Sequence, residues 1–303
     1  WMSAGAWVGI AIVYFLAPRV RRIAQYTVPD ILELRYTPAA RLLGTLAIII
    51  AYMTIASYQF IGGGRLISLV TDLDPATGQL ITAGLVVVFV VLAGMRSIVT
   101  IGLLNGILIL VGIFIAAPIV LSMAGGWSGV TQTLPEQHFT VFGSKGAIAS
   151  FGLFLPTFFL LLGESSMYQK FMSAKNEISA RKAVIGMIIG VIVVETVLDA
   201  TAIFGAGVYW NDPTFFAANG EFNTRATETV LLELARHKLP PFAGMLLLAG
   251  AVAIIFSTAT TFLMIPSTNL ARDVYQRFLK PQASEKEVVF FQRAMIVVLA
   301  AIS

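Results

Sequence analysis

The chain has 303 residues, of which 57% are hydrophobic and 12% are charged. Soluble domains carry about 25% charged residues, so the composition excludes an ordinary soluble enzyme, a disordered chain and a nucleic-acid-binding protein, in spite of a pI of 9.4. The absence of cysteine excludes disulfides and thiolate metal sites, and two histidines far apart argue against a zinc site.

Apolar stretches of bilayer length follow one another along the chain, and a bilayer is spanned by about 20 apolar residues in a helix. The eight stretches are 1–18, 42–70, 79–94, 98–123, 146–168, 183–209, 241–271 and 288–303. The first and last are short, and the chain opens directly on Trp1 without a signal peptide. We therefore expect an all-α, multi-pass membrane protein that is incomplete at both ends.

Basic residues are concentrated in alternate loops: these hold 15 of the 20 Lys and Arg residues. Because Lys and Arg favour the cytoplasmic side of a membrane, we predict a plasma-membrane protein with four cytoplasmic loops. They are 19–41, 95–97, 169–182 and 272–293.

Two connections carry helical signals of their own. Thr27 and Pro29 precede a short apolar run, which is typical of a capped helix with proline in its first turn. We place this helix on the cytoplasmic interface. The spacing of Val230, Leu231 and Leu234 predicts a second, external helix within 227–237.

Polar residues at bilayer depth are costly and indicate function. The densest group is Ser257, Thr258, Thr260 and Thr261, in the middle of 241–271. Hydroxyl oxygens suit a hard cation such as Na⁺. The alternative is that these hydroxyls hydrogen-bond to carbonyls one turn earlier on their own helix, or to a neighbouring helix.

Glu164 lies in a segment bracketed by Pro156 and Gly163, which favour a break in the helix. Broken helices form binding sites at the midplane of transporters. Alternatively, Glu164 lies near the cytoplasmic end of the stretch, in water beside Lys170.

Glu195 and Asp199 are spaced i, i+4 and therefore share one helix face. They could relay protons, bind a cation or form a structural pair with another helix.

Tyr58 and Gln59 precede Gly62-Gly63-Gly64 in the second stretch. We expect the two polar side chains to line a cavity, although Tyr58 could equally be a packed aromatic, and the glycines to allow close helix approach. Phosphate-binding loops, nucleophile elbows and metal pairs do not occur in the sequence, so we predict neither an enzyme nor a bound cofactor.

Four stretches resemble the sodium:solute symporter family. They are 1–4 with the T-x-P-[DE] signature at Thr27–Asp30, Gly94–Val99, Gly163–Lys170 with 173–175, and Ser257-Thr258 followed by Ser267, Asp273 and Tyr275. The resemblance implies a LeuT-like inverted-repeat helix bundle. Residues 1–303 would form a single transporter domain, corresponding to core helices 2 to 9 of ten.

The resemblance also implies site residues. Ser257 and Thr258 match the hydroxyl ligands of the conserved sodium, and Thr260 and Thr261 match a second cation site found in some members. That second site also needs an aspartate, which is Gly102 here. The second site is therefore doubtful, unless another carboxylate compensates.

Substrate contacts are implied in the same way. Glu164 and Ser3 match positions that contact the solute in sugar-transporting members, and we expect Ser166, Tyr58 and Gln59 to join them. Val191 replaces a lysine of some sugar transporters, which argues against a sugar.

The sequence thus predicts sodium-coupled symport of a small organic solute across a lipid bilayer, with Na⁺ as coupling ion. Two alternatives stay open. One is proton coupling through Glu195, Asp199 or Glu164. The other is a symporter-like sensor or anchor domain of a larger signalling protein. Neither the solute nor the oligomeric state follows from the sequence.

Overall fold

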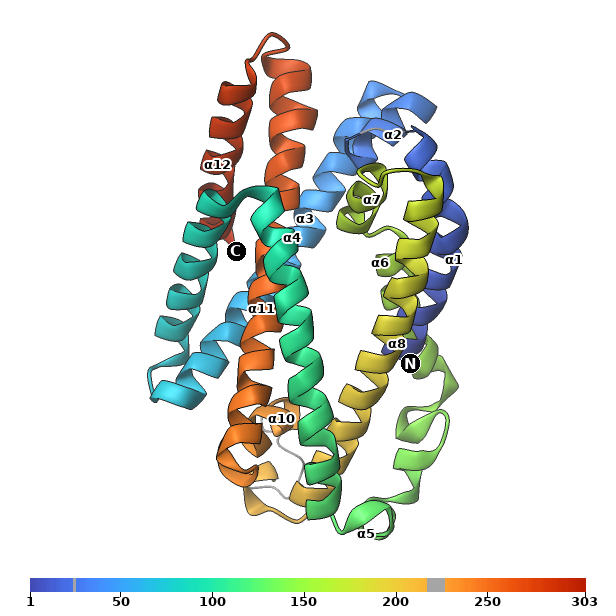
Figure 1. Ribbon diagram of the computed structural model, residues 1–303, viewed down its shortest axis with the longest axis vertical. Helices are drawn as coiled ribbons and strands as arrows, with labels where there is room; N and C mark the ends of the chain where they lie inside the picture. Colours follow the sequence, from blue (N-terminus) through green and yellow to red (C-terminus); the bar gives the residue numbers. More distant parts are fainter. Residues whose placement is uncertain (24–25, 217–226) are drawn as a thin grey trace. The chain divides into compact units, whose positions relative to one another are not determined.

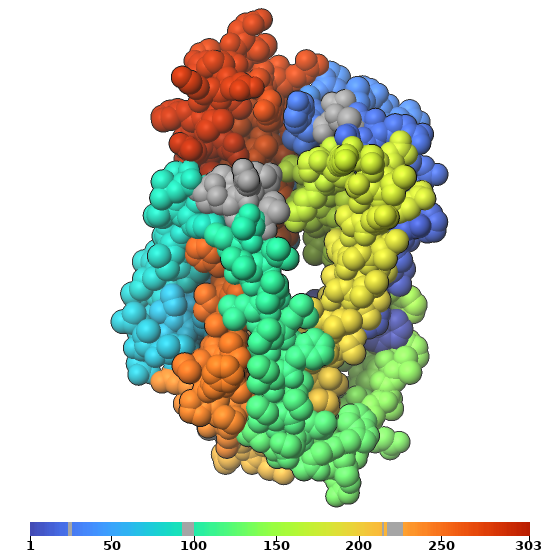
Figure 2. Space-filling model, in the orientation of Figure 1, coloured from blue at the N-terminus to red at the C-terminus, as the bar shows by residue number. Residues whose placement is uncertain are grey.

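The computed structural model describes residues 1–23, 26–216 and 227–303, without the side chains of 93–99 and 214; the residues left out are grey in Figure 2. Every element in this part of the chain is helical (Figure 1). The predicted motif at 94–99, including Arg96, therefore has a described backbone but no described side chains.

The α-helices and short 3₁₀ or π segments follow one another in chain order. They are α1 (Met2–Ile23), α2 (Val28–Arg35), α3 (Pro38–Thr71), α4 (Pro75–Met123), α5 (Gly126–Thr133), η1 (Glu136–Phe139), η2 (Gly143–Lys145), α6 (Gly146–Leu162), α7 (Ser165–Met172), α8 (Glu177–Tyr209), η3 (Pro213–Phe215), α10 (Val230–Glu233), η4 (Leu234–Lys238), α11 (Pro241–Asn269), η5 (Leu270–Leu279) and α12 (Glu285–Ile302).

Seven helical stretches of the described chain are long and apolar enough to cross a bilayer, and they match the first seven predicted stretches. The eighth, 288–303, is helical as α12, but this helix starts with the charged Glu285 and Glu287 and is not among the seven. Residues 95–97, predicted as a turn, lie in helical backbone of α4. Its 49 residues provide two separate apolar stretches, Pro75–Leu92 and Thr100–Met123.

The described chain divides into two compact units, which we call unit 1 and unit 2. Unit 1 comprises Trp1–Ala11, Asn105–Leu162 and Gly186–Ala253. Its core includes Ile113 of α4 and Leu234 and Ala235 of η4. The helix predicted within 227–237 is present as α10 and η4, and Leu234 is fully buried against Gly205 of α8.

Unit 2 comprises Ile12–Leu104, Gly163–Ile185 and Ile254–Ser303. Its core joins Phe60 of α3, Val86 of α4, Leu263 of α11 and Ile296 of α12. Figure 1 shows α12 beside η5 and α2 beside the start of α3, and both pairs are in contact.

The glycines of α3 bring it close to α4, as predicted. A Cβ on Gly64 would lie 2.5 Å from the carbonyl oxygen of Pro75 and 2.9 Å from the backbone nitrogen of Gln79, and a Cβ on Gly63 would overlap the Thr82 side chain. Only a residue without a side chain permits this backbone approach.

Local sequence also sets the start of α2. The Thr27 hydroxyl accepts a hydrogen bond from the Asp30 backbone N–H at 3.2 Å, and the Asp30 carboxylate accepts one from the Thr27 N–H at 2.9 Å. This reciprocal capping box, with Pro29 in the first turn, is the predicted helix start.

Candidate functional site

A break in the helix separates α6 from α7 at Gly163 and Glu164. Glu164 is the N-cap of α7, and its carboxylate accepts hydrogen bonds from the backbone N–H groups of Ser166 at 3.1 Å and Met167 at 3.0 Å. The Ser166 hydroxyl donates to the same carboxylate. The predicted break is therefore confirmed, and it fixes Glu164 and Ser166 together.

Tyr52 joins α3 to this break within unit 2. Its hydroxyl donates to Glu164 Oε1 at 2.5 Å and accepts from the Ser165 backbone N–H at 2.8 Å. Its ring packs on that of Phe262 in α11, with centroids 4.5 Å apart. Tyr52 is 3% exposed, so one buried side chain connects α3, α7 and α11.

Tyr52 was not predicted from the sequence, which pointed instead to Tyr58 on the same helix. Tyr58 is 68% exposed, and neither it nor Gln59 takes part in the Glu164 network. Both tyrosines lie in one apolar stretch, six residues apart. Six residues place them on different faces of a helix, and nothing local says which face is buried.

The four hydroxyl-bearing residues predicted as a group in α11 form two pairs, Ser257 with Thr258 and Thr260 with Thr261. Thr260 and Thr261 each donate to the Ser257 carbonyl oxygen at 2.9 Å, which is the predicted alternative of bonding back to the helix. The hydroxyls of Ser257 and Thr258 make no hydrogen bond with any residue that the structure describes. Of the four hydroxyls, these two are therefore the unengaged pair in the part of the chain that the structure describes. They lie in unit 2, on the helix that carries Phe262.

Two acidic residues of α8, Glu195 and Asp199, face α1 within unit 1. The Ser3 hydroxyl donates to Asp199 Oδ2 at 2.8 Å, and the Trp7 indole N–H donates to Glu195 Oε2 at 2.7 Å. Ser3 and Trp7 are spaced i, i+4, like the two acids, so the helices pair over one turn. The predicted pairing with another helix is present, and Trp7 is a partner that sequence reasoning missed.

Gly102, the position of the family aspartate, has open surroundings. A Cβ there would meet no atom within 4 Å. Among the described residues there is no group of three or more His, Asp or Glu side chains able to hold a metal ion.

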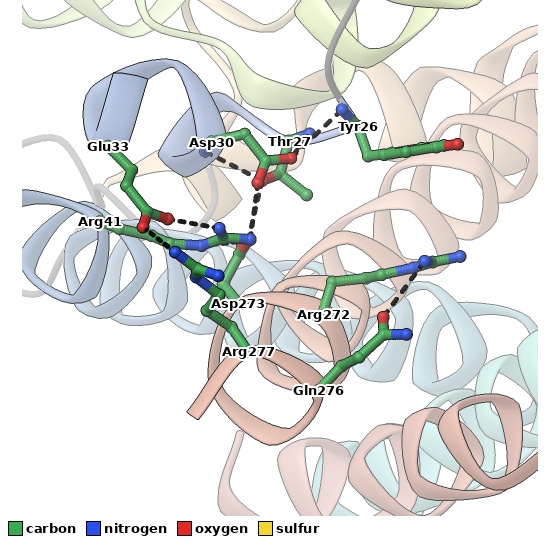
Figure 3. A network of polar contacts seen from close by, with 9 residues as sticks. All are labelled: Tyr26, Thr27, Asp30, Glu33, Arg41, Arg272, Asp273, Gln276 and Arg277. Atoms are coloured by element: carbon green, nitrogen blue, oxygen red, sulfur yellow. Dashed lines mark hydrogen bonds and ion pairs between the residues drawn. The ribbon is translucent and has the colours of Figure 1, made fainter. Parts of the chain in front are cut away.

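A buried ion network ties α2 and α3 to η5 (Figure 3). Arg41 donates to Asp273 Oδ1 at 2.6 and 3.0 Å and to Glu33 Oε2 at 2.6 Å, and it pairs with Asp30 at 2.6 Å. The Thr27 hydroxyl donates to Asp273 at 2.9 Å. The network joins two of the motifs that carried the resemblance, Thr27–Asp30 and the Asp273 segment.

Arg277 extends this network by donating to Glu33 Oε1 at 2.5 Å. The guanidinium groups of Arg277 and Arg41 hold the pKa of Glu33 below its ordinary value, because they stabilise its charged form. Glu33 is therefore a carboxylate shared by two arginines.

The fold and these sites define a helical, multi-pass membrane protein with polar groups gathered at a helix break and on a hydroxyl-bearing helix. The chain belongs to the sodium:solute symporter family, whose model matches residues 1–303. The resemblance stated from the sequence is thereby confirmed.

Similar proteins agree with this assignment. The high-affinity proline transporter PutP of Bacillus subtilis (strain 168) is 25% identical over 99% of this chain and 65% of its own length. The sodium/proline symporter of Escherichia coli (strain K12) is 24% identical over 100% of this chain and 61% of its own. The chain thus spans less than two thirds of these relatives.

A solved structure has the same fold. A Na⁺-coupled sialic acid symporter in its substrate-bound outward-open state matches with a TM-score of 0.83 at 16% identity, over 99% of this chain and 65% of that one. This confirms the predicted LeuT-like helix bundle.

Proposed function

We propose that the protein containing this chain is a sodium-coupled symporter of a small organic solute, working by alternating access. Membership of the sodium:solute symporter family over residues 1–303 is the observation that carries the proposal. The names of the relatives, sodium/proline symporters among them, support sodium as the coupling ion.

Ser257 and Thr258 are proposed as sodium ligands because their hydroxyls are unengaged among the described residues, in contrast to those of Thr260 and Thr261. Sodium moving inward down a potential of 100 mV releases about 2.3 kcal/mol per charge. Binding to one conformation more tightly than to the other is what converts this energy into directed transport.

Glu164 and Ser166 are proposed as solute contacts, held in place by Tyr52 and by the first turn of α7. Ser3, Tyr58 and Gln59 remain proposals from the family resemblance. Transport by binding and release needs no covalent chemistry and no cofactor. The segments 19–41, 95–97, 169–182 and 272–293 are proposed to be cytoplasmic.

The test is uptake by the full-length protein in proteoliposomes, with radiolabelled L-proline and sialic acid as first solutes. A sodium gradient alone should drive uptake, and a pH gradient alone should not. Uptake driven by the pH gradient would instead favour proton coupling through Glu195, Asp199 or Glu164.

The sodium site has its own variants. Ser257→Ala with Thr258→Ala should raise the sodium concentration for half-maximal uptake at least about tenfold, the effect of about 1.4 kcal/mol of lost binding. Thr54→Val is a matched control, because its hydroxyl bonds to the Ile50 carbonyl on an exposed part of α3. Unchanged sodium dependence in the double variant would refute the assigned ligands.

A further inference from the structure

A polar cavity of about 270 Å³ opens in unit 2 between α2, α3 and η5. Its lining includes Tyr26, Asp30, Arg41, Arg272, Gln276 and Arg277. Three guanidinium groups and one carboxylate face a single small space.

The π-helical backbone of η5 is the reason that these groups meet. In a π-helix residue i hydrogen-bonds to residue i+5, as the Lys280 N–H does to the Tyr275 carbonyl at 2.7 Å. Arg272 and Arg277 are five apart, so the π turn brings both to the cavity with Gln276 between them. In an α-helix the neighbours on one face are three and four apart, and Arg277 would point elsewhere.

Each guanidinium is held in position before any ligand arrives. Arg41 is fixed by Asp30, Glu33 and Asp273, and Arg277 by Glu33. These two carry their own counter-ions.

Arg272 is held differently. Figure 3 shows it extended beneath the Tyr26 ring, 5.2 Å from the ring centroid, with one N–H donated to Gln276 Oε1 at 3.2 Å. Among the described residues, no carboxylate pairs with Arg272. Its remaining N–H donors are therefore available to a ligand in the cavity.

We propose that this cavity binds a phosphoryl group, either the headgroup phosphate of an anionic phospholipid or free phosphate. The planar fork of arginine matches the oxygens of phosphate. Tyr26 in the lining is exposed, as are Phe278 and Leu279, which follow Arg277 in the chain. Exposed aromatic and apolar side chains next to basic groups are typical of the membrane interface. The site is separate from the proposed sodium and solute residues.

The experiment measures the thermal unfolding midpoint of the purified full-length protein during titration with three additives. They are phosphatidylglycerol, phosphatidylcholine, and potassium phosphate at constant ionic strength against potassium chloride. Phosphatidylglycerol or phosphate should raise the midpoint, and phosphatidylcholine should not. A shift with phosphatidylglycerol alone assigns the lipid as the source, and a shift with phosphate assigns the free anion.

Three variants test whether the effect is specific to this cavity. Arg272→Gln should weaken the apparent affinity at least about tenfold, because the charge-assisted bonds are lost, and Arg272→Lys should restore only part of it, since the planar fork is missing. Lys286→Gln removes one exposed charge from the start of α12 and should leave the affinity unchanged.

The thermal unfolding midpoint in phosphatidylcholine is the control for correct folding, and it should be the same for the wild type and the variants. Equal weakening by Arg272→Gln and Lys286→Gln would mean general attraction to a basic surface and would overturn the proposal. So would the lack of any shift with phosphatidylglycerol and phosphate.

Discussion

The Tyr52 hydroxyl holds Glu164 and the start of α7 in position. It donates to the Glu164 carboxylate and accepts from the backbone N–H of Ser165, which is fully buried. A phenylalanine would keep the ring contact with Phe262 and remove both of these hydrogen bonds and the longer one from the Ser166 N–H at 3.3 Å. The hydroxyl and the ring of Tyr52 can therefore be tested separately.

Tyr52→Phe should lower the unfolding free energy by about 1–3 kcal/mol, because a buried N–H and a carboxylate oxygen lose their partner. It should also weaken solute uptake at low solute concentration, since Glu164 loses its support. Tyr58→Phe is the control, because Tyr58 is mostly exposed. Loss of uptake in Tyr58→Phe but not in Tyr52→Phe would reverse this assignment and favour Tyr58 as the solute contact.

Arg41 is the buried centre of the α2–η5 network, and its removal should leave the buried Asp273 carboxyl without its main hydrogen-bonding partner. Arg41→Met should therefore cost about 1–3 kcal/mol of unfolding free energy, and adding Asp273→Leu should recover part of it. Arg22→Met is the matched comparison, because Arg22 pairs with Glu177 on the surface and exposed pairs contribute little. Equal losses of stability in Arg41→Met and Arg22→Met would contradict the importance of burial.

At the scale of elements, the close contact of α3 with the start of α4 depends on glycine. Gly64→Ala places a methyl group against the Pro75 carbonyl and the Gln79 backbone, and overpacking of this kind costs about 1–3 kcal/mol. Gly84→Ala on α4 has no atom within 4 Å of the new methyl. It should be neutral or stabilising by about 0.5–1 kcal/mol, as for alanine in a helix. The free energies of unfolding of the two variants are measured in the same detergent. An unchanged value for Gly64→Ala would refute the close contact.

The break between α6 and α7 is an element-scale feature that local sequence determines. Gly163 tolerates the non-helical backbone, and Glu164 caps the next helix with its own carboxylate. The same capping holds the Glu164 side chain at the N-terminus of α7, where the Ser166 hydroxyl also donates to it. The sequence could place this break, but it could not supply the partner from α3.

At the scale of the whole molecule, we predict that the number of coupling ions depends on Gly102. Without the family aspartate we expect one sodium per transport cycle, seen as a Hill coefficient for sodium of about 1. Gly102→Asp has room for its side chain and should raise the coefficient toward about 2 if Thr260 and Thr261 become ligands. Gly84→Asp, equally open but about five turns earlier on α4, should not. A wild-type coefficient near 2 would place a second sodium elsewhere.

The sequence by itself determined the class of protein, seven of the spans, the capped start of α2 and the break at Glu164. These features depend on hydropathy, caps and breakers that act within a few residues, and the family motifs reinforced them. It also singled out the carboxylates and hydroxyls that we propose as site residues, because polar groups stand out in apolar helices.

Only the tertiary structure decided which of these groups meet. Tyr52 joins Glu164 across 112 positions, Arg41 joins Asp273 across 232, and Ser3 joins Asp199 across 196. The choice of Tyr52 over Tyr58 and the engagement of Thr260 and Thr261 depend on which helix face is buried. Packing of distant helices sets that face, and no local pattern in the chain records it.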